Sequence, residues 1–500
     1  MMTTNMTIIL YPFLLLIVAL YFLFHGWPKP SAGSFKRYPI LGTLPEFVAN
    51  RHRFLEWTTG VLSQSSTNTS VLYRPGKLHG VMTANPLNVE HMLKTNFSNY
   101  PKGTYANTML HDFLGAGIFN TDDDLWRFQR KTASFEFNKR SLRVFVLDTV
   151  RTEIQTRLIP FLEHKAASGQ VFDLQDVLER FAFDNVCKIA FNVDLGCLGR
   201  EDDCDGFMKA FEEAATLSFD RFMYVVRNVW KIKKLFNVGS EKRLRKAIKT
   251  VHEFADEIIR RRLEEKSRNY EDFLTRFIDS TTEGASPEFL RDVVISFILA
   301  GRDTTSSALS WFFWLLSLHP KAIDTIRAEV QDCRARRGKP GDDPPDLDEL
   351  RDMYYLHGAI SEALRLYPPV SLDTKSCIRD DVLPDGTHIK KDWFITYNSY
   401  AMGRMESIWG KDCEAFRPER WLENGVFKPE SPFRYPVFHA GPRICLGREM
   451  AYIQMKSIAA CVLERFEVDV VEKEKKPDYV LSLTMRIKGG LPVRVVERNQ

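Results

Sequence analysis

The chain has few cysteines, and none of them are arranged in close pairs. Its eight cysteines, the first at Cys187 and the last at Cys461, include no C-x-x-C spacing. Zinc sites and disulfide frameworks usually carry such pairs, so this distribution argues against both. A reducing compartment fits the cysteine content best.

The sequence also lacks a strong excess of either charge. Its 500 residues carry a formal net charge of +4, with 27% charged and 44% hydrophobic residues. Such a composition is typical of a folded protein and excludes an acidic disordered chain. No RNA-recognition, zinc-finger or P-loop pattern is present, so we predict no nucleic-acid partner. No internal repeat organises the chain.

One segment near the N-terminus lacks charge altogether. Residues Ile8–Phe24 are mostly Leu, Ile, Val, Phe and Tyr. Extended to Thr7–Trp27, the segment reaches the ~20 residues that a membrane helix needs. A cleaved signal peptide is the alternative, but no charged leader and no clear cleavage site precede Pro28. By the positive-inside rule, the remaining chain is placed in the cytosol by the basic residues that follow: Lys29, Lys36 and Arg37.

These features divide the chain into three parts. We predict a single-pass transmembrane anchor at residues 1–27, a stiff proline-containing hinge at 28–45 and a cytosolic domain at 46–500. Helical periodicity dominates that domain. Short apolar and β-branched runs predict a hairpin at residues 71–82 and a strand at 389–400. The expected fold class is mainly α with a smaller β region, preceded by one N-terminal membrane helix.

The longest predicted helix has an unusual centre. It begins at Ser286-Pro287, a typical helix start, and ends at His319-Pro320 after about 50 Å. The centre, Ala300–Thr305, contains a glycine and adjacent threonines, which disfavour a helix interior. By itself, this pattern equally fits a helix kinked for packing. The functional alternative is a groove in which Gly301 lets a ligand approach and the Asp303–Thr304 pair relays protons through water.

A single cysteine lies in the glycine-bounded loop Phe438–Gly447. A helical pattern follows from Leu446 to Phe466, so Cys445 is predicted near a helix N-terminus, where a thiolate is favoured. A lone cysteine is more often buried and inert. A thiolate in this setting is, however, a good axial ligand for haem iron. Arg443, two residues earlier, can pair with an acidic group of a ligand.

Two shorter patterns indicate a site only in combination with the long helix and the cysteine loop. Trp126 and Arg130 lie four residues apart on one helix face, which surface packing alone can explain. Glu362 and Arg365 are spaced as an ordinary helical ion pair, which is usually a minor surface contact. Neither pattern alone predicts a site.

Together, the patterns resemble the cytochrome P450 family. Along the chain, the long helix matches A-G-x-D-T-T, Glu362 with Arg365 matches E-x-x-R, and the cysteine loop matches F-x-x-G-x-R-x-C-x-G. The motifs follow one another in the family's order. Phe416–Trp421 matches the motif that partners E-x-x-R and supplies Arg420. The resemblance implies the cytochrome P450 fold, with haem b held by Cys445 as the thiolate ligand of its iron.

The resemblance also implies roles for individual side chains. Asp303 and Thr304 would manage proton delivery during catalysis. Four residues are expected to bind the cofactor besides Cys445: Trp126, Arg130, Arg443 and, by analogy, Lys375. A structural network behind the haem is expected from Glu362, Arg365 and Arg420. The expected substrate pocket includes Phe119, Phe297, Ala300, Gly301, Val370 and Leu483.

A finer resemblance concerns the substrate. Residues 117–120, 128–133 and 300–311 are similar to the plant clan that hydroxylates the ends of long aliphatic chains. This implies terminal or near-terminal hydroxylation of a fatty acid, with a jasmonoyl–amino acid conjugate or a sterol side chain as alternatives. Val293–Leu299 contains no acid, so we expect no covalent haem ester of the kind found in animal relatives.

The resemblance further implies the reaction partners. Electrons would come from NADPH through cytochrome P450 reductase, O2 would be the co-substrate, and the protein would reside in the endoplasmic reticulum membrane. Two other classes remain as alternatives: a non-catalytic haem protein and a peroxide isomerase. The intact Asp303–Thr304 pair argues against both, because a sensor needs no proton delivery and such isomerases typically lose the threonine.

Overall fold

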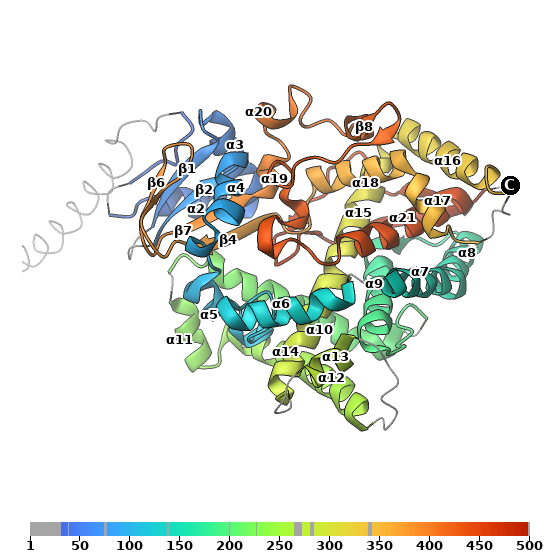
Figure 1. Ribbon diagram of the computed structural model, residues 1–500, viewed down its shortest axis with the longest axis horizontal. Coiled ribbons are helices and arrows are strands. Elements are labelled where there is room, and N and C mark those ends of the chain that lie inside the picture. Colours follow the sequence, from blue (N-terminus) through green and yellow to red (C-terminus); the bar gives the residue numbers. More distant parts are fainter. Residues whose placement is uncertain are drawn as a thin grey trace, which may run out of the picture. The chain divides into compact units, whose positions relative to one another are not determined.

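The computed structural model describes most of the chain beyond its N-terminal segment. The described residues are 32–38, 40–74, 78–137, 140–199, 201–226, 228–264, 273–280, 285–338 and 343–498. The predicted anchor at residues 1–27 and the start of the hinge lie outside these ranges. Within them, no helix combines the length and the apolarity that a bilayer crossing requires. The chain forms two compact units, each described by itself below (Figure 1).

The smaller unit contains the described residues up to Pro101 together with Leu372–Lys411. Its sheet has the strand order β1-β2-β7-β4: β1 Thr69–Arg74, β2 Leu78–Thr83, β7 Phe394–Asn398 and β4 Leu372–Ser376. Strands β1 and β2 form the predicted hairpin, whereas β7 joins β2 in parallel and β4 joins β7 antiparallel. The parallel pairing unites strands that lie far apart in the sequence.

The predicted strand at 389–400 is shorter than expected and divided. It contains the end of β6 His388–Ile389, which pairs with β5 Asp381–Val382, and then β7. The strand stops at Asn398 because this side chain caps the next helix by accepting a hydrogen bond from the Ala401 N–H at 2.9 Å. The helices of this unit are α2 Leu44–Asn50, η1 Arg51–Arg53, α3 Phe54–Gln64, α4 Pro86–Glu90, η2 His91–Thr95, η3 Phe97–Asn99, α19 Ser399–Met402 and α20 Glu406–Trp409.

The larger unit contains Lys102–Ser371 and the described residues from Asp412 onward, and it is mainly helical. Its first helices are α5 Gly103–Leu114, α6 Asp123–Phe137, α7 Arg140–Glu153, η4 Ile154–Leu158, α8 Ile159–Ser168, α9 Leu174–Phe191, α10 Glu201–Asp220, η5 Arg221–Met223, α11 Val229–Leu235, α12 Gly239–Glu264 and α13 Phe273–Asp279. The later helices are α14 Pro287–Ile298, η6 Leu299–Asp303, α15 Thr304–Ser317, α16 Pro320–Ala335, α17 Leu347–Asp352, α18 Tyr354–Leu366, η7 Pro418–Trp421, η8 Pro436–Phe438, η9 Gly441–Arg443 and α21 Arg448–Arg465.

Strands are few and short in the larger unit. β10 Phe466–Val470, β13 Pro492–Glu497 and β3 Phe172–Asp173 form one sheet in the order β10-β13-β3. Two small hairpins pair β8 Leu422–Glu423 with β9 Val426–Phe427, and β11 Tyr479–Val480 with β12 Arg486–Ile487. The prediction of a mainly α protein with a smaller β region is confirmed.

The predicted long helix is present as α14, η6 and α15 in succession. Ser286 caps it by accepting a hydrogen bond from the Phe289 N–H at 3.2 Å, and Pro287 occupies the first turn. The regular helix is interrupted at Leu299–Asp303, where η6 is a π-helical turn. Such single π turns are frequent at functional sites. The interruption lies in the stretch that the sequence marked as unfavourable for a helix.

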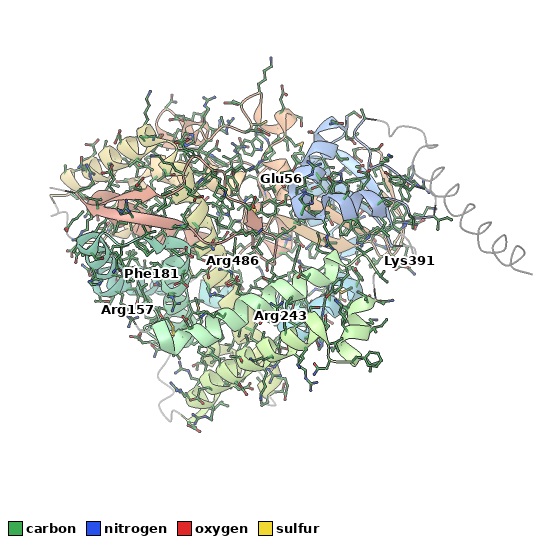
Figure 2. The ribbon with its side chains drawn as sticks, turned by 180° about the vertical axis from the view of Figure 1, so that it is seen from behind. Glu56, Arg157, Phe181, Arg243, Lys391 and Arg486 are labelled. Atoms are coloured by element: carbon green, nitrogen blue, oxygen red, sulfur yellow. A yellow bond between two sulfur atoms is a disulfide. The ribbon has the colours of Figure 1, made fainter. Side chains whose placement is uncertain are left out.

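The core of the larger unit surrounds this helix. Helix α15 contacts α9, α18 and α21 and is buried on all sides between Thr305 and Leu316 (Figure 1). Helix α9 is also buried along most of its length, including Phe181, which is labelled in Figure 2. An apolar cluster extends from α9 and α14 to α10 and α12. The part of the long helix that follows its centre is therefore closely packed by its neighbours.

One disulfide bond departs from the prediction made from cysteine spacing. Cys197 and Cys204 are bonded, with their Cα atoms 5.6 Å apart. The carboxylate of Asp184 accepts hydrogen bonds from the N–H groups of Cys197 and Leu198 and so holds this loop, while Cys204 lies in α10. The spacing rule fails here because the approach of the two cysteines depends on α9, which precedes both.

Candidate active site

The backbone of the cysteine loop is held by local hydrogen bonds. Turns η8 and η9 bring the Cys445 N–H to the carbonyl oxygen of Phe438, with a donor–acceptor distance of 2.8 Å. Gly441 has a φ of +64°, a conformation that a side chain would disfavour. Helix α21 begins at Arg448, shortly after Cys445. The cysteine thus lies close to a helix N-terminus, as predicted.

Cys445 faces a cavity of about 620 Å³. The cavity is lined by residues of α6 and of the cysteine loop: Trp126, Arg127, Arg130, Lys131, Ser134, Pro442, Ile444, Cys445 and Leu446. Three residues that the sequence singled out separately, Cys445, Trp126 and Arg130, therefore border one space.

The electrostatics of Cys445 are less favourable to a thiolate than the sequence predicted. Burial raises the pKa of the thiol, while the Gly447 N–H, Arg130 and Arg448 act in the opposite direction. The side chain is nevertheless solvent-accessible, because the cavity opens onto a sulfur that protein otherwise surrounds. In the protein without a metal ion, the effect of the helix N-terminus on the pKa of the thiol is smaller than the effect of burial. A coordinated metal ion would deprotonate the thiol outright.

Arg130 is a half-buried cation on the cavity wall. Within the described part of the chain, it forms no ion pair. Burial lowers the pKa of Arg130; the nearby Cys445 acts in the opposite direction, and the charge of Arg443 lowers the pKa further. A guanidinium in this position is stabilised by an anionic group entering the cavity.

Arg443 is tied to the start of α6 by an acid that the sequence did not single out for the site. Its Nη2 donates to Asp122 Oδ1 at 2.6 Å and to the Thr121 carbonyl oxygen at 3.0 Å, and its guanidinium lies 4.4 Å from the Trp126 ring centroid. Asp122 also accepts hydrogen bonds from the N–H groups of Lys102 and Gly103. An acid at the start of a helix is ordinary, so no sequence signal indicated that Asp122 would hold Arg443.

The centre of the long helix has one accessible face. Between residues 293 and 316, every residue is buried except Phe297, Ala300, Gly301 and Thr304. Their spacing places them on one side of the helix, in agreement with the predicted groove at Gly301 and Thr304. Gly301 also has a packing function, because a Cβ atom there would lie 2.5 Å from Cγ2 of Val186 in α9.

Asp303 and Thr304 direct their side chains to different partners. Asp303 is buried, its Oδ1 lies 3.0 Å from Nη1 of Arg302, and its side chain is hydrogen-bonded to Thr484. Burial raises the pKa of Asp303. Thr304 Oγ1 donates to the Ala300 carbonyl oxygen at 2.6 Å. In these described residues, no hydrogen bond joins the two side chains, so proton transfer between them needs an intervening water.

The predicted substrate residues are more scattered than Cys445, Trp126 and Arg130, which border one cavity. None of the six, all of which are described, lines the cavity at Cys445. Phe297 packs on Phe273, with ring centroids 3.8 Å apart, and lies near Phe137 of α6. Leu483 packs against the apolar cluster, whereas Phe119 and Val370 are each 40% exposed. The structure brings Phe297, Ala300 and Gly301 to one helix face and leaves the other three apart.

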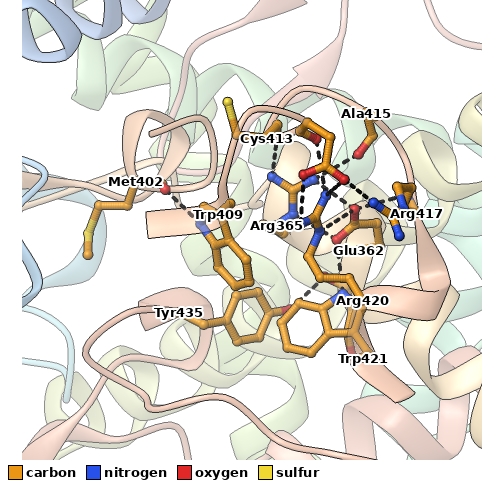
Figure 3. Close-up of polar contacts among 12 residues, drawn as sticks. Glu362, Arg365, Met402, Trp409, Cys413, Ala415, Arg417, Arg420, Trp421 and Tyr435 are labelled. Atoms are coloured by element: carbon orange, nitrogen blue, oxygen red, sulfur yellow. Dashed lines mark hydrogen bonds and ion pairs between the residues drawn. The ribbon is translucent and has the colours of Figure 1, made fainter. Parts of the chain in front are cut away.

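The predicted Glu362–Arg365–Arg420 set is brought together (Figure 3). Glu362 and Arg365 form a doubly hydrogen-bonded pair at 2.7 Å with no exposed side-chain surface, and Arg420 Nε lies 3.3 Å from Glu362 Oε1. Trp421 Nε1 donates to Glu362 at 2.9 Å, a contact that the sequence did not indicate. Arg365 also donates to the carbonyl oxygens of Cys413 and Ala415. The network fixes residues 413–421, which include η7, against α18.

Replacing Glu362 with glutamine is expected to destabilise the fold strongly. The buried guanidinium of Arg365 and the partly buried one of Arg420 would lose their shared carboxylate, and breaking such a buried pair typically costs about 3–5 kcal/mol. The free energy of unfolding in urea measures the effect. Glu423→Gln, which breaks the exposed pair with Lys428, is the control and should cost less than about 1 kcal/mol. An equally small loss of unfolding free energy in Glu362→Gln would contradict a stabilising role of this network.

Lys375 lies in the smaller unit and has a carboxylate partner there. Its Nζ is 2.9 Å from Oδ2 of Asp373, and the Tyr397 hydroxyl donates to the same oxygen at 3.2 Å. Both charged side chains are buried. The Asp373 carboxylate can therefore stabilise the buried charge of Lys375 without a cofactor. Binding of the cofactor by Lys375 stays a prediction.

Comparison with known proteins agrees with this geometry. The family model described as Cytochrome P450 matches residues 33–491. The chain is 52% identical to Cytochrome P450 CYP94D108 of Paris polyphylla, over 94% of this chain and 93% of that protein. It is 45% identical to Cytochrome P450 94A1 of Vicia sativa, over 93% and 90% of the two chains. Cytochrome P450 86B1 of Arabidopsis thaliana is 43% identical over 97% and 90%.

Proposed function

Because the chain belongs to the cytochrome P450 family, as a monooxygenase similar to plant members of groups 94 and 86, we propose that it hydroxylates a fatty acid at the terminal or near-terminal carbon. The observation that carries the proposal is the resemblance to this plant clan, which extends over nearly the whole chain. A jasmonoyl–amino acid conjugate and a sterol side chain are the alternative long aliphatic substrates.

The cavity at Cys445 suits a thiolate-ligated haem. A sulfur faces the space, an indole and a half-buried guanidinium border it, and Arg130 lacks an acid partner among the described residues. Haem bound through Cys445 supplies the activation of O2 and the oxidation of a C–H bond. Arg130 would neutralise a propionate, and the contact of Arg443 with Trp126 would keep the wall beside it in place.

The accessible face of the long helix suits an apolar chain and a proton relay. Phe297 and Ala300 offer apolar surface, and Thr304 holds its hydroxyl in the π-helical turn through the Ala300 carbonyl oxygen. Asp303 would pass protons toward this hydroxyl through water. Reducing equivalents would come from NADPH through cytochrome P450 reductase.

A substrate comparison tests the proposed chemistry. Full-length protein with reductase and NADPH would be given saturated fatty acids of graded length, a jasmonoyl–amino acid conjugate and a sterol, and mass spectrometry would locate the hydroxyl group. We expect fatty acids to be hydroxylated at or beside the methyl end. A dicarboxylic acid of matched length lacks that methyl group and should not be oxidised there. Turnover of only the conjugate or only the sterol would exclude the fatty acid.

The proposed location is the endoplasmic reticulum membrane, with one N-terminal span and a cytosolic catalytic domain. The uncharged segment Ile8–Phe24 supports this location. A surface around α11 adds support, and we define this α11 patch as Val226, Ile232, Leu235, Phe236 and Val238 together with Lys231, Lys233 and Lys234. Leu235 is 79% and Phe236 68% exposed. Exposed apolar groups beside lysines are typical of a surface that lies on an anionic membrane.

Deletion of residues 1–27 is expected to weaken membrane attachment without changing the haem spectrum. The catalytic domain begins beyond this segment, and the α11 patch should retain part of the membrane binding. Flotation with vesicles containing anionic lipid measures the attachment. Adding Leu235→Ser and Phe236→Ser to the deletion should remove the remainder, whereas Ile378→Ser, at an exposed apolar residue outside the patch, should not. A deletion protein unable to bind haem would place the segment in the core.

A further inference from the structure

Asp303 belongs to a buried ion network that extends beyond the proposed relay. Arg302 lies between two acids: its Nη1 is 3.0 Å from Asp303 Oδ1 and its Nη2 donates to Glu179 Oε2 at 3.1 Å. On its other side, Glu179 Oε1 is 2.6 Å from Nη2 of Arg486. Arg486 also pairs with Glu212 of α10. The network therefore joins α9, η6, β12 and α10, with Arg486 visible from behind in Figure 2.

The burial of these groups is graded. The side chains of Arg302, Asp303 and Glu179 are 2%, 6% and 7% exposed, Arg486 is 16% exposed and Glu212 is 44% exposed. Two guanidinium groups therefore balance the two buried carboxylates, and the third carboxylate lies at the surface. Solvent reaches the network from the Glu212 end, at the opposite side of Glu179 from Asp303.

The position of Arg302 couples the charge states of the two buried acids. When Glu179 is ionised, it competes with Asp303 for the same guanidinium and also repels the second negative charge directly. Both effects make Asp303 easier to protonate. When Glu179 is neutral, Arg302 is left to Asp303 alone, which holds that carboxylate in its charged, paired form.

We propose that Glu179 is a positioning residue for proton delivery: its ionised carboxylate draws Arg302 from Asp303 and frees Asp303 to take up and release protons. The inference rests on the proposed monooxygenase function, because Asp303 has a relay to serve only in that reaction. Glu179 itself contacts neither the cavity at Cys445 nor Thr304 in the described structure.

The inference has a definite pH dependence. Burial raises the pKa of Glu179 to about 7, against the attraction of Arg302 and Arg486 and with a contribution from Asp303 and Glu212. Glu179 is then mostly neutral below this pH and mostly ionised above it. The coupling ratio, defined as product formed per NADPH consumed, should therefore rise as the pH increases through about 7.

The test compares the coupling ratio across this pH range in full-length, haem-loaded protein. Glu179→Gln keeps the shape of the side chain but cannot ionise, so it should behave at every pH like wild type below the transition. Above the transition, we expect a coupling ratio about 10-fold lower than wild type, which is less than the ~10²–10⁴-fold contribution of a proton-transfer group because Glu179 acts only through Arg302. Glu179→Asp retains an ionisable group and should restore a pH-dependent ratio.

A second measurement does not depend on turnover. Infrared pH titration of the haem-loaded protein, without substrate or NADPH, should show a buried carboxylic acid band that disappears as the pH rises through about 7 and is missing in Glu179→Gln. Glu153→Gln is the control, since Glu153 is a buried acid paired with Arg157, which Figure 2 also labels. It should leave both the band and the coupling profile unchanged.

The outcomes separate the inference from the proposed function. An unchanged coupling profile in Glu179→Gln, or retention of its titrating band, would overturn the role of Glu179. A wild type that oxidises none of the substrates would instead contradict the proposed substrate class and leave the infrared titration as the test of Glu179. If Glu179→Gln failed to incorporate haem, Glu179→Asp would be the deciding variant, because a coupling ratio that does not change with pH in Glu179→Asp would contradict the inference.

Discussion

Cys445→Ala is expected to lose the red-shifted absorption band of reduced, CO-bound, thiolate-ligated haem together with all detectable turnover. Cys445 is the sulfur at the cavity, and its loop is set by the hydrogen bond to Phe438 and by the turn at Gly441. Without the thiolate, the iron loses the ligand that favours O–O cleavage. The reduced CO difference spectrum and NADPH-dependent product formation measure the two losses.

A second cysteine in the following helix provides the matched control. Cys461 is buried in α21 and does not line the cavity, so Cys461→Ala should keep both the band and turnover. It should cost some stability, because burial of a small apolar side chain is lost. Persistence of the band in Cys445→Ala would show that another residue ligates the iron.

Thr304→Ala is expected to separate NADPH consumption from product formation. Haem and substrate should still bind, and NADPH should still be consumed, but more of the oxygen should leave as hydrogen peroxide. A positioned proton-transfer group typically contributes ~10²–10⁴-fold, so a large fall in the coupling ratio is expected unless water substitutes for the hydroxyl. Simultaneous measurement of NADPH, peroxide and hydroxylated product gives this ratio.

Two threonine variants make this test specific. Thr304→Ser keeps a hydroxyl that can donate to the Ala300 carbonyl oxygen and should retain most of the coupling. Thr305→Ala removes the neighbouring hydroxyl, which is buried away from the accessible face, and should have a smaller effect. Equal coupling ratios in wild type and Thr304→Ala would remove Thr304 from proton delivery.

Local chemistry made several parts of this protein predictable. Ser286-Pro287 starts a helix because both residues suit a helix N-terminus in any protein. The loop around Cys445 is compact and depends on residues within it, so its match to a family motif carried its geometry as well. The hairpin at β1 and β2 likewise depends on neighbouring residues. In each case, the determining contacts lie within a few residues or within one short motif.

Contacts between distant segments could not be predicted in the same way. The pairing of Arg443 with Asp122, of Glu179 with Arg486, and of Trp421 with Glu362 each joins side chains whose spacing carries no signal. An acid at the start of a helix and an arginine near the C-terminus are ordinary residues until the packing of helices places them together.

The sequence by itself determined the cysteine loop, the accessible threonine of the long helix and the family. The tertiary structure decided which acid holds each arginine, why Gly301 must pack against Val186, and how Asp303 is buried away from Thr304. The reason is physical: hydrogen bonds within a turn are fixed by local backbone geometry, whereas the strength of a buried charge pair depends on partners and desolvation that only the folded chain defines.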